Sequence, residues 1–165
     1  MSEWEIRDAG PQDFEEIAAI YNHYIKDTVV TFEEDEVTGE EMGRRITAVT
    51  DSGFPWLSVV QDGRVVGSAY ASQWNKRSAY RFSAEVSVYL DHRATGGGLG
   101  SYLYDALFEI LKGKSVHTAI GGIALPNPAS VALHEKFGME KVAHYKDVGF
   151  KFGKWIDVGY WQVIL

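Results

Sequence analysis

Apolar residues recur along the chain with two different spacings, and the change from one spacing to the other predicts where strands and helices lie. Alternation of apolar and polar residues indicates a half-buried strand, whereas apolar residues three or four positions apart indicate an amphipathic helix. Extended segments are predicted at residues 4–9, 28–32, 56–60, 64–72, 80–90, 116–125, 139–145 and 155–165, and helices at residues 11–25, 38–49, 99–111 and 128–137. This order predicts one α/β domain over residues 1–165, with a mixed, largely antiparallel central sheet flanked by helices.

Segment 80–90 has the most regular alternation in the chain. Its even-numbered residues, from Phe82 to Leu90, are apolar and are predicted to face the core. Its odd-numbered residues include Glu85, a carboxylate in the middle of an otherwise apolar strand.

Two local signals support other predicted elements. Asp62-Gly63 is typical of a tight hairpin turn, and Thr38 is typical of a helix N-cap, with a glutamate three residues later.

Composition restricts the classes of function. Hydrophobic residues make up 45% of the chain and charged residues 24%, as in ordinary globular proteins. A net charge of −7 disfavours nucleic acid as a partner. No apolar run approaches the roughly 18 residues of a membrane helix, and the acidic N-terminal residues do not resemble a signal peptide, so we expect no membrane partner and a cytoplasmic location. The chain has no cysteine, which excludes thiolate metal sites and a thiol acyl-enzyme.

A glycine-rich loop separates the strand at 80–90 from the helix at 99–111. Its four glycines are Gly96, Gly97, Gly98 and Gly100. Backbone N–H groups without neighbouring side chains can approach an anion closely, and the helix N-terminus attracts negative charge, so the loop suits a diphosphate. The alternative is a flexible surface loop. A nucleotide P-loop is excluded because the loop ends Gly-Leu-Gly-Ser, without the required lysine.

Two motifs resemble those of the GNAT superfamily of N-acetyltransferases. Residues 95–100 match both glycines of its cofactor motif, Gln/Arg-x-x-Gly-x-Gly/Ala, although Thr95 stands where Gln or Arg is usual. Residues 127–139 match its second motif, Asn-x-x-Ala/Ser-x-x-Leu-Tyr-x-Lys-x-Gly-Phe, with His134 in place of the frequent tyrosine.

The resemblance covers about residues 4–163 and extends to the phosphinothricin N-acetyltransferases. It is carried further by residues 21–25, 80–89, 125–127 and 149–161. These enzymes and their relatives acetylate phosphinothricin, methionine sulfoximine or methionine sulfone. The resemblance implies direct transfer of acetyl from acetyl-CoA to the α-amine of such a molecule, without a metal. The alternatives are a GNAT enzyme for a polyamine, an antibiotic or a protein N-terminus, and a non-catalytic acyl-CoA-binding module.

Two residues are the candidates for proton transfer. A protonated amine must lose a proton before it attacks a thioester, and Glu85 is the candidate base, because burial within a strand would raise its pKa. The alternative is a solvated charge on an edge strand. By resemblance, His134 occupies the general-acid position from which the leaving thiolate is protonated. The alternative for His134 is a hydrogen bond to cofactor or solvent.

The resemblance also implies how acetyl-CoA is held. The backbone of Val86, Ser87 and Val88 would pair with the pantetheine arm, and an N–H near Val88 would stabilise the oxyanion. Asn127 and Ser130 would bond the same arm, although Asn127 could be only a helix cap. The remaining expected cofactor contacts are Arg93, Ala94, Thr95, Gly96, Gly97, Gly98, Leu99, Gly100 and Ser101.

An amino-acid substrate needs a partner for its carboxylate. Arg77 is the candidate, because it belongs to a basic cluster just before the strand that carries the candidate base and matches an arginine of the resembling enzymes. Tyr80, Lys146 in a predicted loop, and Phe32 are further candidates, and Phe32 could line the pocket of its own chain or that of a partner subunit. For each basic residue the alternative is a solvated loop charge. Aromatic residues make up 13% of the chain, and a homodimer, which is usual in the family, is expected.

Overall fold

Seven strands form one mixed sheet in the computed structural model, which describes residues 3–165. The strands are β1 (Trp4–Asp8), β2 (Trp56–Gln61), β3 (Arg64–Gln73), β4 (Ser83–Leu90), β5 (Thr118–Leu125), β6 (Glu140–Lys151) and β7 (Lys154–Ile164). Their order in space is β1-β2-β3-β4-β5-β7-β6, and every neighbouring pair is antiparallel except β4 and β5. The predicted fold class, a single α/β domain with a largely antiparallel sheet, is confirmed.

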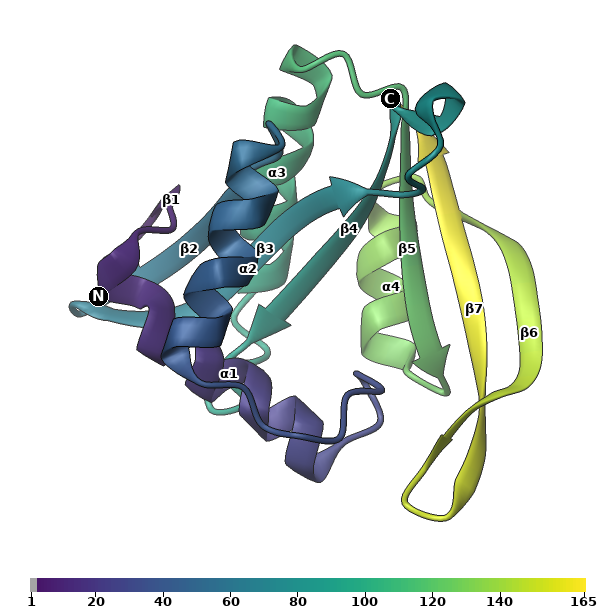
Figure 1. Ribbon diagram of the computed structural model, residues 1–165, viewed down its shortest axis with the longest axis horizontal. Helices are drawn as coiled ribbons and strands as arrows, with labels where there is room; N and C mark the ends of the chain where they lie inside the picture. Colours follow the sequence, from purple (N-terminus) through teal and green to yellow (C-terminus); the bar gives the residue numbers. More distant parts are fainter. Residues whose placement is uncertain (1–2) are drawn as a thin grey trace.

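Helices cover both faces of this sheet (Figure 1). They are α1 (Phe14–Asp27), α2 (Gly39–Asp51), α3 (Leu99–Gly113) and α4 (Pro128–Lys136). Buried residues of α1 and α2 form one core with Trp56 and Val65, and those of α3 form a second core with Ala69 and Val86. The sheet therefore has two differently lined faces, and successive residues of one strand point to opposite cores.

The ends of α1 and α2 depend on short-range hydrogen bonds. Thr38 Oγ1 accepts from the Glu41 N–H at 3.0 Å, which confirms the predicted N-cap of α2. After α1, Thr28 Oγ1 donates to Tyr24 O at 2.8 Å and accepts from the Val30 N–H at 3.1 Å. These bonds turn the chain, and the predicted extended segment 28–32 is a bend rather than a strand.

The predicted strand at 80–90 begins three residues later than its pattern indicated. Residues Ser78–Tyr80 form a 3-10 turn, and Phe82 is 47% exposed rather than in the core. The Arg81 guanidinium lies 4.4 Å from the centre of the Phe82 ring and donates to Ser78 O. Arg81 therefore supplies local contacts in this turn, while Phe82 O still accepts from the His117 N–H at 2.8 Å.

The C-terminal hairpin of β6 and β7 is longer than predicted. Strand β6 continues to Lys151, with an irregular register between Tyr145 and Gly149. Lys146 was predicted in a loop and instead lies in this irregular part of β6. Lys151, at the end of β6, is 2% exposed and its ammonium donates to Thr31 O at 2.8 Å. The extra residues of the bulge broke the alternation by which the strand could have been recognised.

Candidate active site

A groove opens where β4 and β5 separate. The two strands pair only between Ser83–Glu85 and Thr118–Ile120, whereas the other edge of β4 stays paired with β3 as far as Leu90. Within residues 3–165, no strand pairs with the groove-facing edge of β4 beyond Glu85, and Figure 1 shows the two strands diverging. The walls of the groove include Val86, Ser87 and Val88 from β4 and Gly122, Ile123 and Ala124 from β5.

Glu85 lies at the last pairing position before the groove. Its neighbours Ala84 and Val86 are buried in the core under α3, so the Glu85 side chain points to the opposite face, toward α1 and α2. The carboxylate is half-buried, and burial raises its pKa above the ordinary value. Because β4 is the central strand of the sheet, Glu85 is not a solvated charge on an edge strand.

His134 lies at the inner end of the groove and is 4% exposed. Its Nδ1 is 2.7 Å from Ser130 O; because a carbonyl oxygen only accepts, Nδ1 carries the proton. Its Nε2 is 3.0 Å from the Tyr104 oxygen and therefore accepts from that hydroxyl. Burial lowers the pKa of His134, which also favours the neutral ring. Both imidazole nitrogens thus have partners, and close packing leaves room for glycine alone at Gly121, where a Cβ would lie 2.7 Å from the ring.

Tyr104 was not singled out in the sequence. It is fully buried in α3 and lines the groove together with His134. Its neighbours in the helix, Leu103 and Leu107, have the spacing of an amphipathic face, and that pattern indicates burial without indicating a polar partner 30 residues away.

The outer end of the groove is the glycine-rich loop. Thr95, Gly96 and Gly100 line it there, together with Asn127 and Ser130. Gly96 and Gly98 have positive φ angles of 85° and 79°, which favour glycine. A Cβ at Gly96 would meet no atom within 4 Å, so the backbone is open to a ligand. Gly98 is the N-cap of α3, and the loop therefore places exposed N–H groups and a helix N-terminus together, as a diphosphate requires.

Two basic residues are candidates for this end. The Arg93 guanidinium is paired with Asp91 at 2.8 Å and lines a different hollow, beside α1. Lys136, which the sequence analysis did not select, donates from Nζ to Ser101 Oγ in the first turn of α3 at 3.0 Å. Lys136 could have been found from the sequence, because it stands at the lysine position of the second motif. Asn127 caps α4 by accepting from the Ser130 N–H at 3.2 Å and also lines the groove, so its two interpretations are compatible.

The candidate substrate residues are more scattered. Arg77 is exposed in the turn before β4, and among residues 3–165 no carboxylate pairs with its guanidinium. Tyr80 is 43% exposed in the same turn. Phe32 packs on β6, where its ring occupies the space that a Cβ at Gly149 would need. Lys146 lies on β6, and because β7 separates β6 from β5, it is not brought to the groove.

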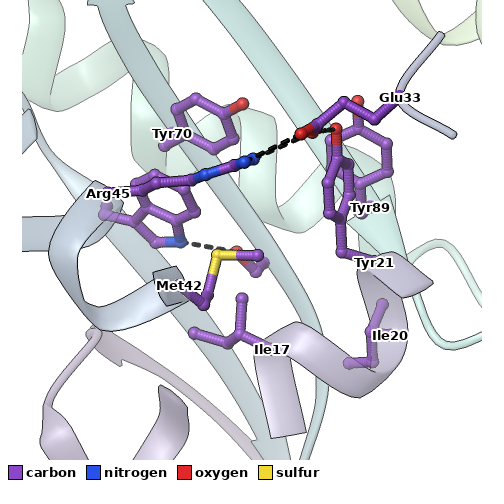
Figure 2. Close-up of a pocket in the computed structure, with 10 residues that line it drawn as sticks. Ile17, Ile20, Tyr21, Glu33, Met42, Arg45, Tyr70 and Tyr89 are labelled. Carbon is purple, nitrogen blue, oxygen red and sulfur yellow. Dashed lines mark hydrogen bonds and ion pairs between the residues drawn. The ribbon is translucent and has the colours of Figure 1, made fainter. Parts of the chain in front are cut away.

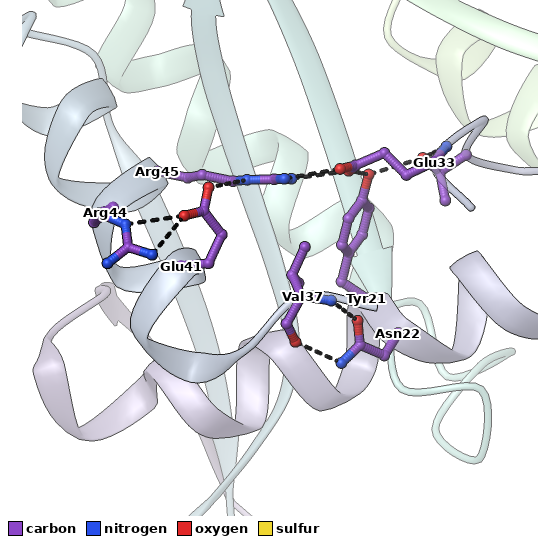
Figure 3. A network of polar contacts seen from close by, with 8 residues as sticks. Tyr21, Asn22, Glu33, Val37, Glu41, Arg44 and Arg45 are labelled. Carbon is purple, nitrogen blue, oxygen red and sulfur yellow. Dashed lines mark hydrogen bonds and ion pairs between the residues drawn. The ribbon is translucent and has the colours of Figure 1, made fainter. Parts of the chain in front are cut away.

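A second cavity, of about 100 Å³, lies on the face that Glu85 also points to. An ion pair between Glu33 and Arg45 stands at its rim, and the Tyr21 hydroxyl donates to Glu33 (Figure 2). Asn22 fixes the segment after α1 through two 2.8 Å hydrogen bonds with the backbone of Val37 (Figure 3). No sequence signal pointed to this site, because its residues come from separate segments.

Comparisons with known proteins identify the family. A model of the acetyltransferase (GNAT) domain matches residues 6–159. The chain is 35% identical to a phosphinothricin N-acetyltransferase of Streptomyces coelicolor, over 98% of this chain and 96% of that one. It is also 35% identical to an L-methionine sulfoximine/L-methionine sulfone acetyltransferase of Pseudomonas paraeruginosa, over 97% and 94% of the two chains. The crystal structure of a GNAT superfamily phosphinothricin acetyltransferase from Sinorhizobium meliloti in complex with acetyl-CoA superposes with a TM-score of 0.95 at 35% identity, covering 98% of this chain and 88% of that one. The chain therefore belongs to the GNAT family of acetyl-CoA-dependent N-acetyltransferases.

Proposed function

We propose that the enzyme acetylates the α-amine of a small amino-acid-like molecule of the phosphinothricin, methionine sulfoximine or methionine sulfone type. The observation that carries this proposal is the position of Glu85. It is a half-buried carboxylate at the last residue of β4 that pairs with β5. The candidate base therefore lies next to the unpaired backbone edge of β4. The relatives named above, similar over almost the whole chain, support the same substrate class.

The groove fits the acetyl donor in shape and charge. The unpaired edge formed by Val86, Ser87 and Val88 would hydrogen-bond an extended amide-containing arm as a further strand would. The open backbone at Gly96–Gly98 and the start of α3 would hold its diphosphate, with Lys136 beside them. When bound, acetyl-CoA supplies an acetyl thioester.

Glu85 would take a proton from the substrate ammonium, directly or through water, because its raised pKa brings it closer to that of the amine. The Val88 N–H would donate to the carbonyl oxygen as that oxygen gains charge. His134 and Tyr104 lie at the inner end of the groove, where the sulfur would leave. Their hydrogen bonds favour a neutral His134, so as a general acid it would need to be protonated or to exchange its tautomer first.

Arg77 would bind the substrate carboxylate, since its guanidinium is exposed and has no carboxylate partner in residues 3–165. Tyr80 comes from the same turn as Arg77 and is proposed at the substrate entrance with it. Phe32 packs on β6 and would need a partner subunit to reach the substrate. Lys146 lacks this support on its own chain and would reach a substrate only across a subunit interface.

A homodimer of this chain is part of the proposal. The end of the β6–β7 hairpin extends beyond the other strands in Figure 1. Its exposed apolar side chains include Tyr145, Val148, Phe150, Phe152 and Trp155, the last 65% exposed. An apolar cluster of this kind is typical of an interface. The cytoplasm, where acetyl-CoA is available, is the proposed location; among residues 3–165, no helix combines the length and apolarity needed to cross a bilayer.

The test is release of free thiol from acetyl-CoA with a panel of amines. The panel contains methionine sulfone, methionine sulfoximine and phosphinothricin, the carboxyl-amidated form of each, spermidine, an aminoglycoside and a peptide N-terminus. We expect the free amino acids to react and their amides to react poorly. Faster turnover of spermidine, the aminoglycoside or the peptide, or equal turnover of the amides, would refute the amino-acid substrate.

A further inference from the structure

The cavity between α1, α2 and the sheet shares no lining residue with the glycine-loop end of the groove. Its position relative to Glu85 follows from the alternation of β4. Glu85, Ser87 and Tyr89 project from the same face, and Tyr89 packs against Tyr21 of α1 with ring centres 5.0 Å apart. Tyr70 of β3 lies opposite Ser87, one step along the face from Glu85. The cavity is thus the continuation, along one face of the sheet, of the position where the amine would react.

Tyr89 lines both hollows. It belongs to the groove that contains Val86–Val88 and to the cavity that contains Glu33 and Arg45. The two hollows therefore meet at Tyr89, on the face of the sheet to which Glu85 points.

The cavity is of side-chain size. A cavity of about 150 Å³ accommodates benzene, so about 100 Å³ has room for about four heavy atoms. Ile17, Ile20 and Met42 form its apolar side, and the hydroxyls of Tyr21, Tyr70 and Tyr89 gather on the other side with the ion pair (Figure 2). This lining suits a short aliphatic stem that ends in a polar group.

The charges at the rim are already balanced. Arg45 donates to both oxygens of Glu33 at 2.8 Å and to Glu41 at 3.2 Å. These carboxylates occupy the guanidinium, and Glu41 also binds Arg44 (Figure 3). An anionic group entering here would lose water without gaining a free cation, which is unfavourable.

One hydroxyl in the cavity, that of Tyr89, is available to donate a hydrogen bond to a neutral oxygen. The Tyr89 hydroxyl has no hydrogen-bond partner among residues 3–165. Burial raises the pKa of Tyr89 well above its ordinary value, so the hydroxyl keeps its proton. The Tyr21 hydroxyl, by contrast, already donates its hydrogen bond to Glu33.

We propose that this cavity receives the uncharged polar end of the acceptor's side chain, of sulfone or sulfoximine type. The Glu33–Arg45 pair selects against an anionic end such as a phosphinate, and Tyr89 donates to the neutral oxygen. The proposal rests on the proposed function and narrows it to one substrate class.

The test compares three amino acids with similar stems: methionine, methionine sulfone and phosphinothricin. In the wild type, kcat/KM should be highest for the sulfone. In Glu33→Gln, Arg45 keeps Glu41 at its Nε, but its two terminal nitrogens lose their carboxylate. The preference for phosphinothricin over the sulfone should then rise by roughly tenfold or more, as expected for a new charge-assisted hydrogen bond. The matched control is Glu40→Gln, which removes the same charge from an 84% exposed side chain on α2 and should leave the preference unchanged.

A second variant tests the donor. Tyr89→Phe should lower kcat/KM for methionine sulfone more than for methionine, since the two substrates differ by the sulfone oxygens. A thermal unfolding midpoint for each variant establishes that it is folded.

The inference is overturned if folded Glu33→Gln keeps the wild-type preference, if Glu40→Gln shifts it equally, or if Tyr89→Phe affects the sulfone and methionine alike. If the wild type acetylates none of the three amino acids but acetylates another amine, the proposed function fails as well. If it acetylates them without these preferences, only the present inference fails.

Discussion

Replacing Glu85 by glutamine should have opposite effects on activity and on stability. Glutamine keeps the shape of the side chain but cannot accept a proton, and loss of a general base lowers turnover by roughly 10²–10⁴-fold at pH 7. At about 1.36 kcal/mol per factor of ten, this raises the barrier by about 2.7–5.4 kcal/mol. Affinity for acetyl-CoA, measured by calorimetry, should change little, because the β4 edge contributes backbone groups.

The stability effect has the other sign because burial raises the pKa of Glu85. Above that pKa the folded protein carries a half-buried carboxylate, whereas the unfolded chain carries a hydrated one, so ionisation of Glu85 destabilises the fold. Glutamine removes this penalty. Glu85→Gln should therefore unfold at a higher urea concentration than the wild type at pH 7–8, and the difference should vanish as the pH falls below the ordinary glutamate pKa, where the carboxyl is protonated in both states.

Two assays check this pair of effects. Thiol release measured against pH should show that the acid limb of kcat/KM in the wild type lies above the ordinary glutamate pKa and disappears in the variant. Urea unfolding at several pH values gives the stabilities. Glu109→Gln is the control, because Glu109 is 76% exposed on α3. Wild-type turnover in Glu85→Gln at pH 7, or a loss of stability there, would refute the argument.

Four further predictions concern the groove, the fold and the dimer. Gly98→Val places a branched side chain at a φ of 79° at the start of α3 and should weaken acetyl-CoA binding strongly; unchanged affinity by calorimetry in a folded variant would remove the loop from the site. Gly121→Ala puts a methyl group 2.7 Å from an imidazole and should lower the free energy of unfolding by about 1–3 kcal/mol, or the Tm by roughly 2–12 °C, whereas Gly113→Ala, with open space around it, should not destabilise. Arg77→Lys should raise KM more than it lowers kcat, with kcat/KM falling roughly 10- to 150-fold, since lysine lacks the forked geometry; a pure kcat effect would argue against carboxylate binding. Trp155→Glu should shift sedimentation from dimer to monomer, and a wild type that sediments as a monomer would refute the dimer.

Local signals in the sequence predicted the parts of the site that depend on backbone conformation and period. The glycines at 96 and 98 adopt the positive φ angles that other residues avoid, and the apolar spacing after them begins a helix at Leu99. The alternation of segment 80–90 assigned Glu85 to the face opposite Val86. These are properties of a residue and its near neighbours, so they are already present in the order of residues.

The alternation of apolar and polar residues failed to give the strand ends at two places. Phe82 continues the apolar pattern but lies outside the strand, because the turn before β4 has its own contacts. Lys146 and Lys151 fell outside the predicted strand because the bulge in β6 interrupts its period. In both places the alternation identified a strand but misplaced one of its ends.

The chemistry of the site depends most on the tertiary structure. The groove exists because β4 pairs with β5 only as far as Glu85, and no residue signals where two strands separate. His134 meets Tyr104 across 30 positions, and the cavity joins Glu33 with Arg45 from different segments. Local order of residues accounts for the positive φ angles, the cap of α2 and the face to which Glu85 points. Which side chains meet, and which backbone edge stays open, was decided by packing between distant segments, because those contacts form only when the whole sheet and both of its cores are assembled.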